Sequence, residues 1–250
     1  MIQSIGKAFK ILDLIGRRKE LGIAEMVKEL RWKKSTVQRL ASTLEELGYL
    51  EKNPLTMKYR LSFKLYTLGN LTKIRLNVHS AALPFLQKLQ AGTDESVYLG
   101  VMDLHEVVYI EHLPSRHVLQ PLIQNGFRAP LYCTAIGKVL LAHLNNGEAR
   151  RVFHSAGLKR LTPNTITSPR ALEKALSDIR KKGFALDNEE YHIGITSIAA
   201  PIRNESDQVI AAASVAGPTS RLDLDNLKKM VGLLRRTTES VSLALQGSLP

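Results

Sequence analysis

The chain has 250 residues, of which 44% are hydrophobic, and a formal net charge of +12. This length suits two domains of unequal size, and the hydrophobic content excludes an intrinsically disordered protein. No apolar run approaches the roughly 18–20 residues that span a bilayer, the start MIQSIGKAFKIL lacks the pattern of a secretory signal, and the single cysteine, Cys133, excludes an intrachain disulfide. We therefore expect a cytoplasmic protein with no membrane segment and an anionic partner.

The positive charge is concentrated near the N-terminus. Residues 1–64 contain 14 Lys or Arg and seven Asp or Glu, a balance of +7, whereas the remaining 186 residues hold 21 against 16, a balance of +5. A quarter of the chain thus carries more than half of the excess. Surface lysines that only maintain solubility are the simpler explanation of this excess, and an anionic partner is the other. The motifs decide between these two explanations.

The first 65 residues predict three helices followed by a hairpin. The helices are expected at 4–18, 21–30 and 34–47, where apolar residues recur every three or four positions, and Gly48 stands where a glycine commonly ends a helix. Two short strands, 49–51 and 58–61, flank the turn signal Asn53-Pro54. This order predicts a winged helix-turn-helix. The expected core faces are Ile5, Phe9, Leu12 and Ile11 or Ile15 on the first helix, and Val37, Leu40, Leu44 and Leu47 on the third.

The rest of the chain mixes helices with strands. A helical connector is expected over 63–89, with an interruption near Asn77, and paired strands follow at 96–104 and 107–113. Helices are expected at 135–144, 171–181 and 222–245, and a second hairpin joins 197–203 to 209–217 through the turn at Asn204 to Asp207. The fold class is therefore α+β, with domains 1–65 and 91–250 joined by a helical linker, 66–90.

The third helix of the first domain has the composition of a DNA-reading element. A recognition helix presents the residues near its N-terminus to base edges, and here these are Ser35, Thr36, Gln38, Arg39 and, further along, Ser42. Gln pairs with adenine and Arg with guanine. Contacts with phosphates fix the register of the protein on DNA, and Lys33, Lys34 and the hydroxyls of Ser35 and Thr36 suit this role. In the hairpin, Lys58 and Arg60 are expected on one side, toward the DNA backbone or minor groove.

For any single helix, a solvated polar face is the better interpretation. The complete order of helix, turn, helix and basic hairpin, together with the local charge excess, favours binding to double-stranded DNA.

Both halves of the chain resemble one family. The segments 3–15 (QSIGKAFKILDLI), 34–50 (KSTVQRLASTLEELGYL) and 59–69 (YRLSFKLYTLG) look like the N-terminal domain of IclR-type transcriptional regulators, and 130–142 (PLYCTAIGKVLLA) and 180–218 continue the match. The resemblance implies a winged-helix domain, a linker helix and a GAF-like domain that binds a small effector. It also implies a homodimer or a dimer of dimers that represses or activates a catabolic operon.

The residues also predict where an effector binds. Thr134, Ala135, Ile136 and Gly137 lead into a helix, and free N–H groups at a helix start attract anions such as a carboxylate. An ordinary helix entry capped by Thr134 is the alternative. The resemblance implies effector contacts at the positions of Ala135, Ile136, Asp187, Ser197 and Ser214. Asp187 is expected to accept a hydrogen bond from a ligand hydroxyl or to act as a polar gate; a solvated loop acid is its simpler interpretation.

The sequence offers little support for other functions. The seven histidines form no close ligand pair, and with one cysteine a metal site is not expected, nor is a cofactor. No GxSxG elbow, P-loop or dinucleotide fingerprint is present. Two rivals stay open: an enzyme that processes a small acid and carries a DNA-binding appendage, and a non-specific architectural DNA binder. The leading interpretation is a regulator that senses a small organic acid.

Overall fold

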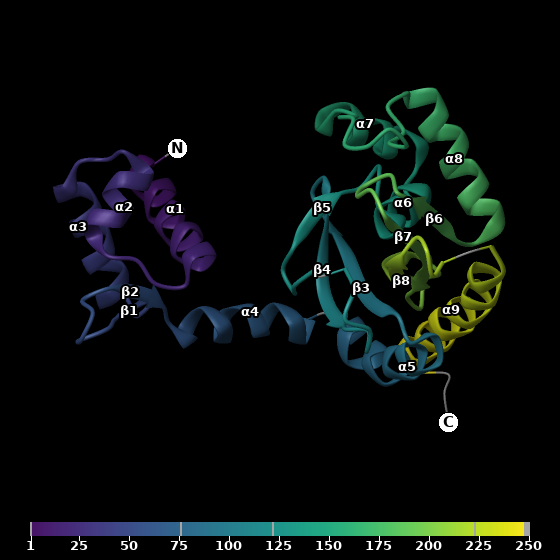
Figure 1. The fold of residues 1–250 in the computed structure, drawn as a ribbon, viewed down its shortest axis with the longest axis horizontal. Helices are drawn as coiled ribbons and strands as arrows, with labels where there is room; N and C mark the ends of the chain where they lie inside the picture. Colours follow the sequence, from purple (N-terminus) through teal and green to yellow (C-terminus); the bar gives the residue numbers. More distant parts are fainter. Residues whose placement is uncertain (1, 76, 122, 223, 248–250) are drawn as a thin grey trace. The chain divides into compact units, whose positions relative to one another are not determined.

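The computed structural model describes residues 2–75, 77–121, 123–222 and 224–247. The chain forms two compact units, residues 1–75 and 76–250, which are described separately. Both expected fold types are present: a small helical unit with a hairpin, and a larger unit in which helices cover a sheet (Figure 1). Across these described ranges, no helix is long and apolar enough to cross a membrane.

The first unit is a winged helix-turn-helix. It contains α1 (Gln3–Arg18), α2 (Ile23–Leu30), α3 (Lys34–Glu46), β1 (Leu50–Lys52), β2 (Tyr59–Leu61) and α4 (Phe63–Arg75). Gly48 ends α3 with a φ of +75°, and its N–H donates to the carbonyl of Glu45 at 2.8 Å, as the sequence predicts. Leu21 pairs with Tyr59 and adds a third short segment to the wing.

The core of this unit differs from the expected core on one side. Ile11 and Ile15 are buried against α2 and α3, but Ile5 and Phe9 are 53% and 61% exposed, and Leu47 is also exposed. These side chains line a groove of about 440 Å³ between α1, α3 and α4. The periodicity therefore predicted the helices correctly but overestimated the core, because a short three-helix unit cannot cover every apolar face.

The second unit is built on a six-stranded antiparallel sheet of order β5-β4-β3-β8-β7-β6. Its strands are β3 (Ser96–Asp103), β4 (Glu106–Leu113), β5 (Arg128–Pro130), β6 (Ala185–Asn188), β7 (Ile195–Arg203) and β8 (Val209–Pro218). Its helices are α5 (Asn77–Thr93), α6 (Ala135–Ala142), α7 (Asn146–Ala156), α8 (Pro169–Lys182) and α9 (Leu224–Leu245). The two hairpins expected from the sequence are β3–β4 and β7–β8. Two short edge strands, β5 and β6, and helix α7 were not expected.

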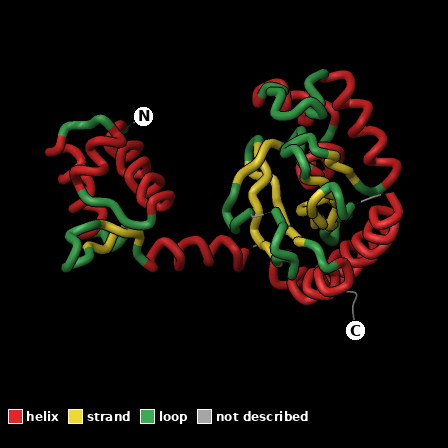
Figure 2. Tube along the Cα trace, in the orientation of Figure 1, coloured by secondary structure: helices red, strands yellow, loops and turns green. Residues whose placement is uncertain are grey.

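Strand alternation divides the second unit into two cores. Val97, Leu99 and Val215 point to the face covered by α5 and α9, and Tyr98 and Ala216 point to the face covered by α6 and α8. Figure 2 shows the helices on both sides of the strands. Because the α6 face also carries Ser197 and Ser214, which lie buried among alanines, this face is the one that can hold a polar ligand.

Candidate DNA-reading surface and effector cavity

The polar face of α3 is open to solvent. Val37, Ala41 and Leu44 are buried and anchor the helix in the core of the first unit. Ser35, Gln38 and Arg39 are exposed, and Thr36 and Ser42 are half-buried. Within the described ranges, no side-chain hydrogen bond or ion pair occupies any of these five polar residues. The face is therefore free to bind another molecule through its donors.

The basic residues of this unit divide into free and engaged groups. Lys33 and Lys34, at the start of α3, are exposed and have no ion-pair partner in the described part of the chain. In the wing, by contrast, Lys58 Nζ lies 3.0 Å from Glu25 Oε1, and Arg60 Nη2 lies 3.0 Å from Glu51 Oε2. Glu25 also accepts the N–H of Gly22, which with Lys58 lowers the pKa of its carboxyl. Lys33 and Lys34 are therefore free to bind phosphates, whereas Lys58 and Arg60 are already paired.

The second unit contains a cavity of about 260 Å³ on the α6 face of the sheet. Most of the residues that line it are aromatic or apolar, and polar groups enter from the sheet and from the start of α6. The residues that line it are Tyr98, Tyr109, Pro121, Ile123, Phe127, Thr134, Ile136, Asp187, Tyr191, His192, Ile195, Ser197, Ser214 and Ala216.

Strand register brings the polar residues of the cavity together. Asp187 in β6 lies opposite Ser197 in β7, and the Ser197 hydroxyl donates to Asp187 Oδ2 at 3.4 Å. Ser214 in β8 lies opposite Tyr98 in β3. The Tyr98 hydroxyl donates to the carbonyl of Pro121 at 2.6 Å, which fastens the loop over the cavity. Residues more than 100 positions apart in the chain thus form one wall.

The start of α6 supplies donors to the same place. Thr134 caps the helix by accepting the N–H of Gly137 at 3.1 Å, so the simple capping role is confirmed. In the described structure no acceptor is found for the N–H groups of Ala135 and Ile136, although both residues are buried. A buried N–H without an acceptor is costly, so an anion at this helix start is stabilised.

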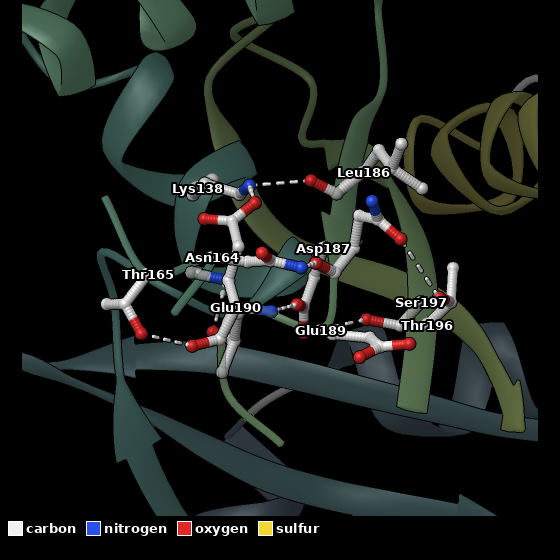
Figure 3. A network of polar contacts seen from close by, with 12 residues as sticks. Lys138, Asn164, Thr165, Leu186, Asp187, Glu189, Glu190, Thr196 and Ser197 are labelled. Carbon is white, nitrogen blue, oxygen red and sulfur yellow. Dashed lines mark hydrogen bonds and ion pairs between the residues drawn. The ribbon is translucent and has the colours of Figure 1, made fainter. Parts of the chain in front are cut away.

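Behind Asp187 lies a buried polar network, drawn in Figure 3. Lys138, on α6, donates to the carbonyl of Leu186 at 2.5 Å and forms an ion pair with Glu190. The N–H of Glu190 donates to Asp187 Oδ1 at 2.8 Å. Thr165 donates to the carbonyl of Glu190 at 2.7 Å, so the segment after β6 is held from two sides.

Burial controls the protonation of this network. Desolvation raises the pKa of Asp187 to about 7, although the N–H of Glu190 and the Lys138 ammonium lower it in part. Burial also raises the pKa of Glu190, against the attraction of Lys138. The Cys133 thiol next to the helix start has its pKa raised to about 12 by burial, which makes it a poor nucleophile at neutral pH.

Most, but not all, of the effector residues expected from the sequence lie in this cavity. Thr134, Ile136, Asp187, Ser197 and Ser214 line it. Ala135 lies in the apolar core, with only its backbone N–H at the helix start. Gly137 is not among the residues that line the cavity; its N–H donates to Thr134, and a Cβ there would lie 2.3 Å from the carbonyl oxygen of Leu131.

Asp187 is not a solvated loop acid, since it lies in β6 and is 5% exposed. Sequence reasoning missed the aromatic wall formed by Tyr98, Tyr109, Phe127 and Tyr191. It also missed the Lys138–Glu190 pair, although a lysine inside the apolar segment AIGKVLLA was a signal that could have been used. Among the residues that the structure describes, no group of three His, Cys, Asp or Glu is placed to hold a metal ion.

Comparison with known proteins decides the family. Residues 4–54 match the IclR helix-turn-helix domain, and residues 72–243 match the model of the bacterial transcriptional regulator IclR C-terminal domain. The chain belongs to the IclR family of bacterial transcriptional regulators. It is therefore a ligand-responsive, DNA-binding transcription regulator, with a helix-turn-helix unit and an α+β effector unit.

Relatives of this IclR-family regulator match it over nearly its whole length. The HTH-type transcriptional regulator KdgR of Escherichia coli is 35% identical over 241 residues, which cover 96% of this chain and 92% of KdgR. The Thermotoga maritima IclR structure has a TM-score of 0.84 and 30% identity and covers 98% of this chain and 100% of that one. An IclR homologue from Microbacterium hydrocarbonoxydans, solved with 4-hydroxybenzoate, has a TM-score of 0.82 at 27% identity over 92% and 93% of the two chains.

Proposed function

We propose that this protein controls a catabolic operon by binding operator DNA through α3 and by releasing or retaining it when a small carboxylic acid fills the cavity. Residues 1–65 would read DNA, 66–90 connect, and 91–250 sense the ligand, in the cytoplasm. The observation that carries the proposal is the cavity, which is lined by Thr134 and Ile136 at the start of α6 and by Ser197 and Ser214 of the sheet.

The open face of α3 supports the DNA-reading role. Gln38 and Arg39 can each make a bidentate contact with a base in the major groove, worth about 1–3 kcal/mol of discrimination. Lys33, Lys34, Ser35, Thr36 and Ser42 are assigned to phosphates or neighbouring bases. Lys58 and Arg60 are assigned to the DNA backbone, and each has to exchange its present carboxylate partner for a phosphate.

The chemistry of the cavity supports a particular kind of effector. A carboxylate would accept the N–H groups of Ala135 and Ile136, while Asp187, Ser197 and Ser214 would bond to hydroxyl groups at the other end of the ligand. The volume of about 260 Å³ lies below the range of drug-sized sites, which favours a small acid. The homologue solved with 4-hydroxybenzoate holds a ligand that has both a carboxylate and a hydroxyl.

We also propose that the protein acts as a homodimer or a dimer of dimers. The apolar groove between α1, α3 and α4 includes the exposed Ile5, Phe9 and Leu47, and an apolar surface of this kind is typical of a protein interface. A symmetric dimer reads two half-sites, which matches the usual symmetry of operators. Sedimentation of the full chain and of Phe9→Asp tests this assembly: an unchanged mass argues against this surface.

The enzyme alternative is not part of this proposal. The relatives are transcriptional regulators, and burial keeps the single cysteine, Cys133, as a thiol that is a poor nucleophile. Turnover of candidate acids by the purified chain would support the enzyme alternative.

The decisive experiment measures DNA affinity with and without an acid. A duplex selected by the protein from a random-sequence pool serves as the operator probe, and an unselected duplex serves as the control. A panel of small acids that includes 4-hydroxybenzoate is first screened by thermal shift. An acid that stabilises the protein is expected to change the affinity for the selected duplex at least fivefold. Equal affinities at saturating acid refute control by DNA release, and equal affinities for both duplexes support the architectural rival.

A further inference from the structure

Two hydroxyl groups in the effector cavity have no hydrogen-bond partner. Tyr109 in β4 and Ser214 in β8 line the cavity and are only 4% and 3% exposed. Within the described ranges of the chain, neither hydroxyl donates to or accepts from another group. The hydroxyls of Tyr98, Thr134 and Ser197, by contrast, each donate to an oxygen of the protein. A buried hydroxyl without a partner costs about 1–3 kcal/mol, so a polar atom of a ligand is expected beside Tyr109 and Ser214.

Tyr109 is held in place before any ligand binds. Its N–H donates to the carbonyl of Phe127 at 3.0 Å, and its carbonyl accepts the N–H of Gly126 at 2.7 Å. Its ring meets the Tyr98 ring edge to face, with the centroids 5.6 Å apart, and lies 6.2 Å from the Phe127 ring. Because the backbone and the ring are both fixed, the hydroxyl can bind a ligand without the entropy cost of ordering a flexible side chain.

The phenol of Tyr109 is a neutral hydrogen-bond donor. Burial raises its pKa well above the usual value, and the negative charge of Asp187 raises it further. The phenol and the carboxylate are thus near enough to interact electrostatically, yet no hydrogen bond joins them in the described structure. A ligand group that lies between them is bound best if it accepts from the phenol and donates to the carboxylate.

A hydroxyl group of the ligand satisfies both of these neighbours. It is a donor and an acceptor at once, so it can accept from Tyr109 and donate to Asp187. A keto oxygen can accept from Tyr109 but has no proton for the carboxylate, and a methylene group does neither. The two protein groups therefore distinguish acids by the oxygen that they carry away from the carboxylate.

We infer that Tyr109 determines the specificity of the cavity by donating to a hydroxyl group of the effector, whose own proton is donated to Asp187. The effector is then a hydroxy acid rather than a keto acid or an unsubstituted acid. An analogue without the hydroxyl is rejected because it leaves the buried Tyr109 phenol unpaired. This inference rests on the proposed effector role of the cavity, and its test separates the two.

Matched acids provide the test on the full chain. Isothermal titration calorimetry at pH 8 measures the Kd of 4-hydroxypentanoate, 4-oxopentanoate and pentanoate, which differ at one carbon, and of the pair 4-hydroxybenzoate and benzoate. The proteins are wild type, Tyr109→Phe and Tyr132→Phe, and urea unfolding checks that each variant is folded. Tyr132 is a matched control because it is also 4% exposed, but its hydroxyl donates to the carbonyl of Lys159 at 2.8 Å and it does not line the cavity.

Wild type is expected to bind the hydroxy acid of at least one set about tenfold or more tightly than the keto and unsubstituted acids of that set. Tyr109→Phe should weaken the binding of this hydroxy acid about tenfold, which corresponds to the loss of one hydrogen bond. The same variant should change the Kd of the unsubstituted acid by less than about twofold, because that acid makes no bond to the phenol. Tyr132→Phe should keep the wild-type ratio between the acids.

Three results would overturn the role of Tyr109. The first is a wild type that binds the keto or unsubstituted acid as tightly as the hydroxy acid in every set, a comparison that does not depend on any variant. The second is a Tyr109→Phe variant that weakens all acids by the same factor, as a purely structural role of the ring would. The third is an equal change of the ratio in Tyr132→Phe. If no acid binds wild type, the proposed effector site fails instead.

Discussion

Replacing Asp187 by Asn is expected to stabilise the second unit at high pH and to have little effect in acid. Asn has nearly the same shape, and its carbonyl oxygen can still accept the N–H of Glu190, which now donates to Asp187 Oδ1 at 2.8 Å. Its amide can donate to the Ser197 hydroxyl, which lies 3.4 Å from Asp187 Oδ2. The substitution therefore removes the buried charge and preserves the packing.

The magnitude follows from the raised pKa of Asp187, which is about 7 in the folded protein against a usual 3.8. Below pH 4 both the folded and unfolded states carry the proton, so the carboxyl costs nothing. Between pH 4 and 7 only the unfolded state releases it, and the free energy of unfolding falls as the pH rises. At about 1.4 kcal/mol for each tenfold change in the acid constant, the full cost above pH 7 is about 4 kcal/mol.

Urea unfolding of the full chain at pH 4.5 and pH 8.5 tests this prediction. Far-UV circular dichroism follows both units, whereas the fluorescence of Trp32, the single tryptophan, follows only the first. Asp187→Asn should exceed wild type in stability by about 2–4 kcal/mol at pH 8.5 and by less than about 1 kcal/mol at pH 4.5. Asp178→Asn, on α8 and outside the network, is the control. A difference that does not change with pH, or a variant less stable at pH 8.5, refutes the reasoning.

Other substitutions test the remaining assignments. Arg39→Ala should lower the ratio of selected to unselected duplex affinity about tenfold or more, and an unchanged ratio means that the reading face is wrong. Lys34→Ala should reduce the slope of log Kd against log salt by about 1, and Lys58→Ala should reduce it less because Lys58 already neutralises Glu25; equal slopes contradict this distinction. Gly137→Ala should destabilise the second unit by about 1–3 kcal/mol in urea, because its Cβ meets a backbone carbonyl at 2.3 Å. Lys138→Met should cost about 3–5 kcal/mol by leaving a buried carboxylate unpaired, and a cost near zero means that the ion pair is dispensable.

Local patterns predicted much of this molecule. The repeats of apolar residues placed α1, α2 and α3 to within about two residues at each end, and Gly48 ends α3 where a glycine is expected. Period-two patterns placed β3, β4, β7 and β8. Three elements were missed for local reasons: β5 has three residues and β6 has four, too few to show a period, and α7 is mostly polar.

The candidate effector site contains contacts that such local patterns do not predict. The sequence predicted that Ser197 and Ser214 share a face, because each lies on a strand of one hairpin. It did not predict that Tyr98 stands opposite Ser214 or that Lys138 neutralises Glu190, since both contacts join segments that are distant in the chain. The aromatic wall of the cavity was missed for the same reason.

The sequence alone determined the type of each long element, the polar face of α3 and the family resemblance, because these depend on neighbours within a few residues or on matched motifs. Only the tertiary structure decided which of those residues are free to act. It engages Lys58 and Arg60, exposes Ile5 and Phe9, and buries Asp187 in a cavity. Burial, ion pairing and pKa values depend on which segments are in contact, and the packing of the helices against the sheet determines those contacts.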